Sequence, residues 1–329
     1  MMLRKKRDVV LVGCGPLAFE TARDLSRRAQ VVGAFSLKGE AARPDLPVPQ
    51  LGRAEGLAAF LAQNPVDEVY IATDVRRHYS TLQSVVETCE RLGIPFAVPA
   101  HVFSLGRALP RDARFVADGY VHYVLTISKP VQDATKRMVD VALSSVALAA
   151  LAPLFLLVAA AIKLTSKGPV FFTQLRVGLR GRMFGMYKFR SMVVDAERRL
   201  EELQAKNEQT GPVFKMRHDP RITPVGRILR KFSIDELPQL INILRGEMAI
   251  VGPRPPVPSE VAQYQPWQRR RLSVRPGLTC LWQVQGRNNI GFDEWMMLDL
   301  QYVDQWSFAK DVALIGRTVP VVVSGKGSS

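Results

Sequence analysis

Two adjacent carboxylates, Asp235 and Glu236, are the residues of this sequence best suited to chemistry on a phosphate. Neighbouring side chains on a helix point about 100° apart, so one carboxylate can face a reacting phosphorus while the other holds a metal ion. Aspartate can form an acyl-phosphate as a nucleophile, and Mg²⁺ prefers carboxylate and phosphate oxygens together. A structural interpretation competes, because Ser233 and Glu236 have the spacing of a capping box at a helix start.

Several cations in the same half of the chain could hold phosphate groups. Arg254 lies between Pro253 and Pro255, and the stiff backbone suits an arginine that presents a two-pronged guanidinium to a phosphate. The other candidates are Lys188, Arg190, Arg275 and Arg287. A solvated surface position is the alternative for each of them. Together they predict a phosphate site between about residues 188 and 289.

An uncharged stretch runs from Val141 to Ile162, longer than the roughly 18 residues that indicate a membrane segment. Pro153 lies near its centre, where a proline bends or breaks a helix. Both flanks are basic, which favours the cytoplasmic side for both ends. We therefore predict a re-entrant helix that enters the bilayer, bends at Pro153 and leaves on the same face. A plain spanning helix and a buried core helix are the alternatives.

Charged residues border this stretch on both sides. Asp140 is expected to pair with Lys136 or Arg137 at the level of the lipid headgroups. Later clusters, at residues 227–232 and 267–271, mix cations with apolar side chains, which suits an anionic membrane surface. A solvated charged face is the usual alternative for any one cluster.

The composition limits the classes of protein and partner. Of the 329 residues 47% are hydrophobic, which excludes a disordered tail, and the length predicts two domains. The net charge of +15 indicates an anionic partner. We expect anionic lipids and phosphorylated small molecules and no nucleic acid, because no nucleic-acid module is recognisable. Three distant cysteines, Cys14, Cys89 and Cys280, indicate a reducing compartment and have no metal-ligand spacing.

The first third alternates predicted strands and helices, which predicts an α/β fold with a doubly wound parallel sheet. Strands are expected at residues 8–12, 31–35, 67–73 and 94–98, and helices from the first glycine turn to about residue 28 and over residues 78–92. Gly13, Gly15 and Ala18 match the glycine fingerprint of dinucleotide-binding domains. The acidic residue usual after the second strand is missing at residues 36–38. We therefore expect a Rossmann-like fold without a redox cofactor.

Taken in order, the later stretches resemble the bacterial sugar transferase family, which comprises monotopic polyprenyl-phosphate phosphoglycosyl transferases. The resemblance covers the C-terminal 200 residues: the proline-broken membrane helix, Lys188–Met192, Asp219–Thr223, Asp235–Gln239, Gly252–Pro255 and Arg275–Asn288. The first part resembles the Rossmann-like domain of the long members, which usually begin with four transmembrane helices. This sequence shows none, so either the protein is naturally shorter or the numbering starts inside it.

The resemblance implies three parts. They are a Rossmann-like, CoA-binding-like domain over residues 1–128, a basic approach with a re-entrant membrane helix over 129–168, and a mainly α-helical, membrane-associated catalytic domain over 169–329. Pro153 matches the proline of the re-entrant helix. Ala152 stands where family members often have serine, and Cys280 where they often have glycine.

The resemblance also implies the reaction. Such enzymes move a sugar-1-phosphate from a UDP-sugar to undecaprenyl phosphate, release UMP and form the polyprenyl-diphosphate sugar that initiates exopolysaccharide, capsule or O-antigen synthesis. Asp235 matches the nucleophile of a covalent phosphosugar intermediate. Glu236 matches the carboxylate linked to Mg²⁺, and Arg254 matches the phosphate-binding arginine. The sugar stays open, with glucose and galactose as the family-based expectations.

The implied location is the bacterial inner membrane, with the catalytic domain on the cytoplasmic face, where the UDP-sugar and undecaprenyl phosphate meet. Because homo-oligomers are common, we also expect a homodimer. Two other functional classes stay open. One is a membrane-tethered NAD(P)-binding oxidoreductase in which the first domain performs the reaction, and the other is a non-catalytic membrane scaffold.

Overall fold

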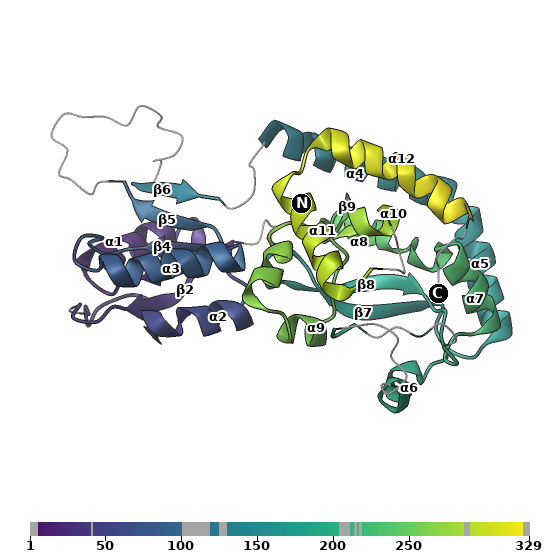
Figure 1. The fold of residues 1–329 in the computed structure, drawn as a ribbon, viewed down its shortest axis with the longest axis horizontal. Helices are drawn as coiled ribbons and strands as arrows, with labels where there is room; N and C mark the ends of the chain where they lie inside the picture. The colour runs from purple at the N-terminus through teal and green to yellow at the C-terminus, as the bar shows by residue number, and fades with distance from the viewer. Residues whose placement is uncertain are drawn as a thin grey trace. The chain divides into compact units, whose positions relative to one another are not determined.

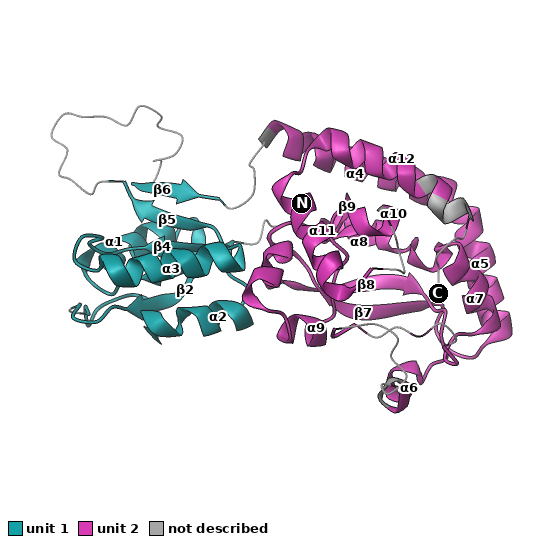
Figure 2. Ribbon diagram, in the orientation of Figure 1, with its two compact units in different colours: residues 1–126 teal, residues 127–329 magenta. Residues whose placement is uncertain are grey.

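The computed structural model describes residues 6–40, 42–100, 119–124, 130–203, 211–213, 216, 219–285 and 290–324. The chain divides into two compact units, residues 1–126 and residues 127–329 (Figure 2). Each unit has hydrophobic clusters of its own.

The described strands of the first unit form one sheet, in the order β3-β2-β1-β4-β5-β6 (Figure 1). The strands are β1 (Arg7–Val12), β2 (Ala29–Ser36), β3 (Gln50–Arg53), β4 (Glu68–Ile71), β5 (Phe96–Pro99) and β6 (Tyr120–Tyr123). Every pairing is parallel except that of β5 with β6. This strand order is the one found in doubly wound dinucleotide-binding folds. The predicted α/β fold with a mainly parallel sheet is thus confirmed.

Helices cover both faces of this sheet. Helix α1 (Pro16–Leu25) packs on one face, and α2 (Leu57–Gln63), which follows the 3₁₀ turn Ala54–Gly56, packs with α3 (Tyr79–Leu92) on the other. The alternation of side chains along β1 explains the two cores, because Val9 and Leu11 face α1 while Val10 and Val12 face α2 and α3. Helix α3 ends at Gly93, whose φ of 71° is left-handed, as expected of a helix-terminating glycine.

Two helices separated by a sharp bend open the second unit. Helix α4 (Pro130–Ala150) and helix α5 (Ala152–Thr165) meet at about 60°. The bend lies at Leu151, two residues before the predicted position. Pro153 lies in the first turn of α5, where its missing N–H leaves no helical bond unmade. A proline therefore breaks the helix, as predicted, but the chain turns ahead of the proline ring.

The helix pair α4 and α5 is the candidate membrane segment within the described residues. None of the described helices is alone long and apolar enough to cross a bilayer, whereas α4 and α5 together meet that requirement by length and composition.

The rest of the second unit is mainly helical, as predicted. An antiparallel hairpin, β7 (Phe171–Val177) and β8 (Met183–Phe189), connects through the 3₁₀ turn Leu179–Gly181, and β9 (Ala249–Val251) pairs in parallel with β10 (Gly277–Thr279). The helices are α6 (Ala196–Leu203), α7 (Pro224–Lys231), α8 (Gln239–Arg245), α9 (Pro258–Ala262), α10 (Leu281–Gln285), α11 (Phe292–Asp304) and α12 (Phe308–Ser324). Two 3₁₀ segments, Ile234–Glu236 and Pro266–Ser273, complete it.

Three charged residues of α4, Lys136, Arg137 and Asp140, pack against the rest of the second unit, whereas Asp133 is exposed. Lys136 contacts the Asp311 carboxylate at 2.5 Å and the Val251 carbonyl at 3.1 Å. Asp140 is 5% exposed and accepts a hydrogen bond from the backbone N–H of Ile250 at 3.2 Å. The expected approach of Asp140 to Lys136 is present at 4.0 Å. Both groups are held inside the unit by β9 and α12, and their place at the level of the lipid headgroups stays a prediction.

Arg137, the next residue of α4, also binds another element of the second unit. The Arg137 guanidinium donates to the carbonyls of Ile243 and Leu244, at 2.6 and 2.9 Å. These are among the last carbonyls of α8, which have no partner inside the helix and attract a cation. Arg137 therefore caps the C-terminal end of α8 and attaches it to α4.

Candidate active site

The two carboxylates Asp235 and Glu236 lie on a 3₁₀ turn ahead of helix α8. Ser233 begins the turn with a left-handed φ of 54°, which is uncommon for a residue with a side chain. Its hydroxyl makes no capping hydrogen bond, and the Glu236 carboxylate points to Lys188 instead. The capping-box interpretation is therefore wrong, because the Glu236 carboxylate pairs with Lys188.

Lys188 is the cation opposite Glu236, with its Nζ atom 2.8 Å from Oε1 of Glu236. The fully buried Asn242 of α8 holds β8 in this position. Its Oδ1 accepts from the N–H of Tyr187 at 3.0 Å, and its Nδ2 donates to the carbonyl of Gly185 at 2.8 Å. Because these bonds lie one and three residues before Lys188 along β8, they tie to α8 the part of the strand that leads to the lysine.

Arg254 follows strand β9 on an extended, proline-rich segment. This segment lies so close to β10 that a side chain at Gly277 would meet the backbone nitrogen of Gly252 at 2.1 Å. Arg254 lines one small cavity together with Lys188 and Glu236. The remaining lining residues are Met186, Gln239, Pro255, Gly277, Leu278 and Gln283. Three of the predicted site residues thus meet, although they are distant in sequence.

The two carboxylates have opposite electrostatic environments. Burial acts to raise the pKa of Glu236, but Lys188 and Arg254 outweigh it and lower this pKa to about 2. Burial raises the pKa of Asp235 above its usual value, and the charge of Glu236 adds to this effect, while Lys188 opposes it. Because the pair is coupled, its titration belongs to both groups together. The surroundings thus favour the ionised form of Glu236 and disfavour that of Asp235.

Other candidates from the sequence lie elsewhere. The Arg190 guanidinium donates to the Ser166 and Lys167 carbonyls beyond the end of α5. Arg275 donates to the Gly246 carbonyl at 3.1 Å. Neither residue lines the cavity, and Arg287 lies outside the described residues.

Metal binding at this site would depend on substrate oxygens. In the described part of the chain, no group of three or more His, Cys, Asp or Glu side chains could hold a metal ion. Mg²⁺ is usually bound through one or two carboxylates plus substrate phosphates. The ionised Glu236, in a cavity that Lys188 and Arg254 also line, fits that donor set.

Residues that the sequence did not single out complete the site. Gln239 and Gln283 line the cavity, and Gln283 is oriented by the backbone N–H of Cys280, which donates to its Oε1 at 3.1 Å. Arg176 is buried, and its charge acts on Glu236. Burial raises the pKa of the Cys280 thiol well above its usual value, so this cysteine is an uncharged packing residue. Neither a glutamine nor one arginine among many has a sequence pattern that would predict a place in the site.

The glycine turn of the first unit is occupied by the chain's own carboxylate. Glu40 accepts hydrogen bonds from the backbone N–H groups of Cys14 at 2.9 Å and Gly15 at 3.2 Å, and from the Thr73 hydroxyl at 3.0 Å. Its negative charge also adds to burial in raising the pKa of the Cys14 thiol to about 11. Pro16 has no N–H to offer. Donors that would face a pyrophosphate in a dinucleotide-binding domain are thus used by Glu40.

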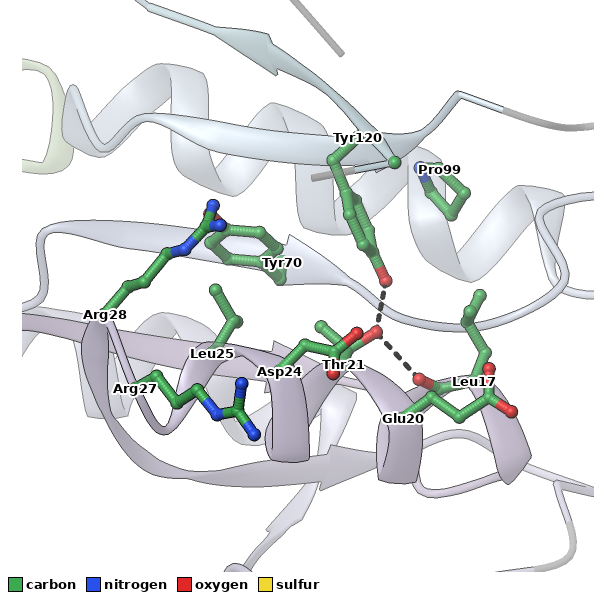
Figure 3. A pocket seen from close by; sticks show the side chains of 11 residues that line it. Leu17, Glu20, Thr21, Asp24, Leu25, Arg27, Arg28, Tyr70, Pro99 and Tyr120 are labelled. Carbon is green, nitrogen blue, oxygen red and sulfur yellow. Dashed lines mark hydrogen bonds between the residues drawn. The ribbon is translucent and has the colours of Figure 1, made fainter. Parts of the chain in front are cut away.

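A larger cavity of the first unit lies between α1 and the sheet (Figure 3). Tyr120 reaches across it, and its hydroxyl is 2.6 Å from that of Thr21, which also donates to the Leu17 carbonyl. Exposed charged side chains of α1 and the residues after it stand around the opening, namely Glu20, Asp24, Arg27 and Arg28. Gly13, Gly15 and Ala18 do not line this cavity.

Replacing Glu40 by alanine should destabilise the first unit. The change leaves two buried N–H groups and one hydroxyl without their acceptor, so we expect a loss of about 1–3 kcal/mol in the free energy of unfolding, measured by urea denaturation. Glu55→Ala, at an exposed acid of the same unit, should change it by less than about 0.5 kcal/mol. NADH should not bind the wild type in a fluorescence titration. Tight NADH binding together with a stable Glu40→Ala variant would contradict this interpretation.

The comparisons with known proteins identify the family of this chain. The family described as bacterial sugar transferase matches residues 131–325. A galactosyl transferase of Streptococcus agalactiae is 39% identical over 277 residues, which are 83% of this chain and 62% of that protein. An exopolysaccharide production protein of Rhizobium meliloti is 43% identical over 204 residues, 61% of this chain and 90% of that protein.

A third relative extends over the first unit as well. An undecaprenyl-phosphate glucose phosphotransferase of Komagataeibacter xylinus is 33% identical over 340 aligned positions, 97% of this chain and 59% of that protein. The chain thus spans about three fifths of two of these relatives and nine tenths of the other. The family match contains Lys188, Asp235, Glu236 and Arg254 and covers more than half of the chain. The chain therefore belongs to the bacterial sugar transferase family.

Proposed function

We propose that this chain is the enzyme that transfers a sugar-1-phosphate from a UDP-sugar to undecaprenyl phosphate, releasing UMP. Its class, a sugar-phosphate transferase, follows from the family. The substrates rest on the relatives, of which one is named a galactosyl transferase and another an undecaprenyl-phosphate glucose phosphotransferase. The observation that carries the proposal is the buried Asp235 next to the group of Glu236, Lys188 and Arg254.

In the first half-reaction, an oxygen of the Asp235 carboxylate attacks the phosphorus that carries the sugar. A bond forms between aspartate and phosphorus, the bond from that phosphorus to the bridging oxygen breaks, and UMP leaves. Arg254 and Lys188 line the cavity beside the dyad, so their charges stabilise the negative charge that builds up on the phosphate oxygens. The product is a phosphosugar bound to the enzyme.

In the second half-reaction, a phosphate oxygen of undecaprenyl phosphate attacks the same phosphorus. The bond from Asp235 to phosphorus breaks, the carboxylate is restored and the polyprenyl-diphosphate sugar forms. A covalent intermediate lets one cavity serve a soluble donor and a lipid acceptor in turn, which predicts ping-pong kinetics. The acceptor's phosphate stays at headgroup height, so the site must be held there.

Glu236 is the residue that would hold Mg²⁺ with the donor's diphosphate. The bound ion would supply Lewis-acid neutralisation of the phosphate charges. Lys188 holds the Glu236 carboxylate in place from the other side and, with Arg254, keeps it ionised.

The bent helix pair fits a re-entrant placement in the inner membrane. Between its two outer ends, its exposed apolar side chains are Met138, Leu143, Val146, Leu156 and Leu157. The 14 residues of α5 span about 21 Å at ~1.5 Å per residue, enough to pass through one leaflet but not the ~30 Å hydrocarbon core. Such a hairpin would leave the catalytic unit on the cytoplasmic face, beside anionic lipids that attract the basic chain.

Replacing the nucleophile should abolish the covalent intermediate. With a panel of UDP-sugars and Mg²⁺ but no acceptor, intact-protein mass spectrometry should show a phosphosugar adduct on the wild type. Asp235→Asn should show none and should lose turnover by a factor on the order of 10³ or more. Glu294→Gln, at an exposed acid of α11, should behave as wild type. Full activity of Asp235→Asn would favour a non-catalytic scaffold.

The cation at Lys188 should set the acid limb of the pH profile. Because both carboxylates lose a neighbouring positive charge in Lys188→Met, their pKa values rise, and protonation begins at higher pH. We expect the acid limb of kcat/KM to move up by about 1–3 pH units. Lys188→Arg keeps the charge and should keep the limb near its wild-type position. Equal loss at every pH, without a displaced limb, would show that Lys188 does not tune the dyad.

Labelling can distinguish a re-entrant from a spanning helix pair. Val131 is 78% exposed and Leu164 is 87% exposed, and they lie near the two outer ends of the pair, so single cysteines there are accessible. The native cysteines Cys14, Cys89 and Cys280 are buried. In inverted vesicles, a membrane-impermeant maleimide should label both Val131→Cys and Leu164→Cys. Labelling of the two positions from opposite sides would establish a spanning helix and overturn the re-entrant placement.

A further inference from the structure

The segment Pro253–Pro256 has no regular secondary structure, yet every carbonyl oxygen in it accepts a hydrogen bond. At its two ends, backbone N–H groups are the donors: Gly277 donates to Pro253 and Val177 donates to Pro256, both at 2.9 Å. In its centre, side chains are the donors. Arg271 donates to the Arg254 carbonyl and Arg176 to the Pro255 carbonyl, both at 2.8 Å.

The sequence of this segment explains why it is held through its carbonyls. Three of its four residues are prolines, which have no N–H, so the segment cannot join a strand ladder in the usual way. Its ends are within reach of β10 and β7, whose backbones supply N–H groups. The two central carbonyls are reached by long side chains, and a guanidinium can bind a carbonyl while its other nitrogens are fixed elsewhere.

Both of these arginines are themselves immobilised. Arg176 is 8% exposed and donates from Nε and Nη2 to the Gln174 side chain, at 3.1 and 2.5 Å. Arg271 is 2% exposed, pairs with Asp299 at 2.6 Å and donates to the Tyr264 hydroxyl at 2.7 Å. Burying a guanidinium is unfavourable, and burial lowers the pKa of Arg176 to about 10. Simple packing would be served better by apolar side chains.

The arginine between these carbonyls has a different role. Within the described residues, no hydrogen bond or ion pair involves the guanidinium of Arg254, which is partly exposed and lines the cavity with Lys188 and Glu236. We propose that Arg176 and Arg271 are positioning residues, which fix the backbone of Arg254 so that its guanidinium meets the donor's diphosphate without rearrangement. This assignment rests on the proposed function of the site.

A double-mutant cycle between Arg176 and Arg254 tests the proposal. In the Asp235→Asn background, which cannot react, the affinity for the UDP-sugar is measured for Arg176→Met, for Arg254→Met and for both together. If Arg176 acts through Arg254, Arg176→Met alone weakens donor binding by roughly 10–100-fold, since small misplacements of a charged group are costly. In chains that already carry Arg254→Met, the same change should weaken binding by less than about threefold.

Two further variants separate positioning from other roles. Arg176→Lys keeps the charge that acts on Glu236 but not the planar fork, so it should recover only part of the loss, and it replaces Arg176→Met if that chain does not fold. Arg221→Met removes another buried arginine, one that binds Asp219 and the Ala196 carbonyl and does not line the cavity. Its effect on affinity should be the same with and without Arg254.

The outcomes are distinguishable. If Arg176→Met weakens binding by the same factor in both backgrounds, its role is structural only, and the positioning proposal is overturned. If the chain with Asp235 intact binds the UDP-sugar but never forms an adduct, the proposed covalent reaction fails, while the cycle on binding still decides the role of Arg176. If no UDP-sugar binds to any variant, both proposals fail.

Discussion

The geometry of the catalytic unit depends on the polar face of helix α4. Arg137 holds the end of α8, whose first residue lies three positions after Glu236, while Lys136 and Asp140 hold β9, whose last residue lies three positions before Arg254. One helix therefore contacts both the element that follows Asp235 and Glu236 and the strand that precedes Arg254. The same helix continues to the bend at Leu151, so α4 connects the apolar helix pair directly to the elements of the site.

The site combines strong positive charge with restricted solvent access. Lys188 and Arg254 line the cavity, and Arg176 lies buried behind them, so the Glu236 carboxylate keeps its charge despite partial burial. Asp235 is buried next to that charge and is easier to protonate. Two neighbouring carboxylates thus acquire different properties from their surroundings, which is the condition for assigning one to bond formation and the other to binding a cation.

The sequence predicted what depends on local patterns and missed what depends on tertiary contacts. The strands near residues 8–12 and 31–35 are long and buried, so they were found, whereas β3 is four residues long, mostly exposed and has no alternation to detect. The Asp235–Glu236 pair was proposed from its residue types, and the structure places Glu236 beside Lys188 and Arg254. The capping box failed because Lys188, 48 residues away, binds the carboxylate. Lys136, Arg190 and Glu40 look like surface charges in sequence, and only the fold provides their partners.

Gly252 and Gly277 have a consequence for how this enzyme could change. Neither has a left-handed backbone, so glycine is required there by space and not by conformation. Added side chains would meet backbone atoms at 2.4 and 2.1 Å, respectively. The backbones at these two glycines, which lie in different parts of the chain, are therefore so close that no side chain fits between them. Variation at either glycine would displace its neighbour, whereas Gln239 contributes a side chain to the cavity wall, so a change there can reshape the cavity without separating the two loops.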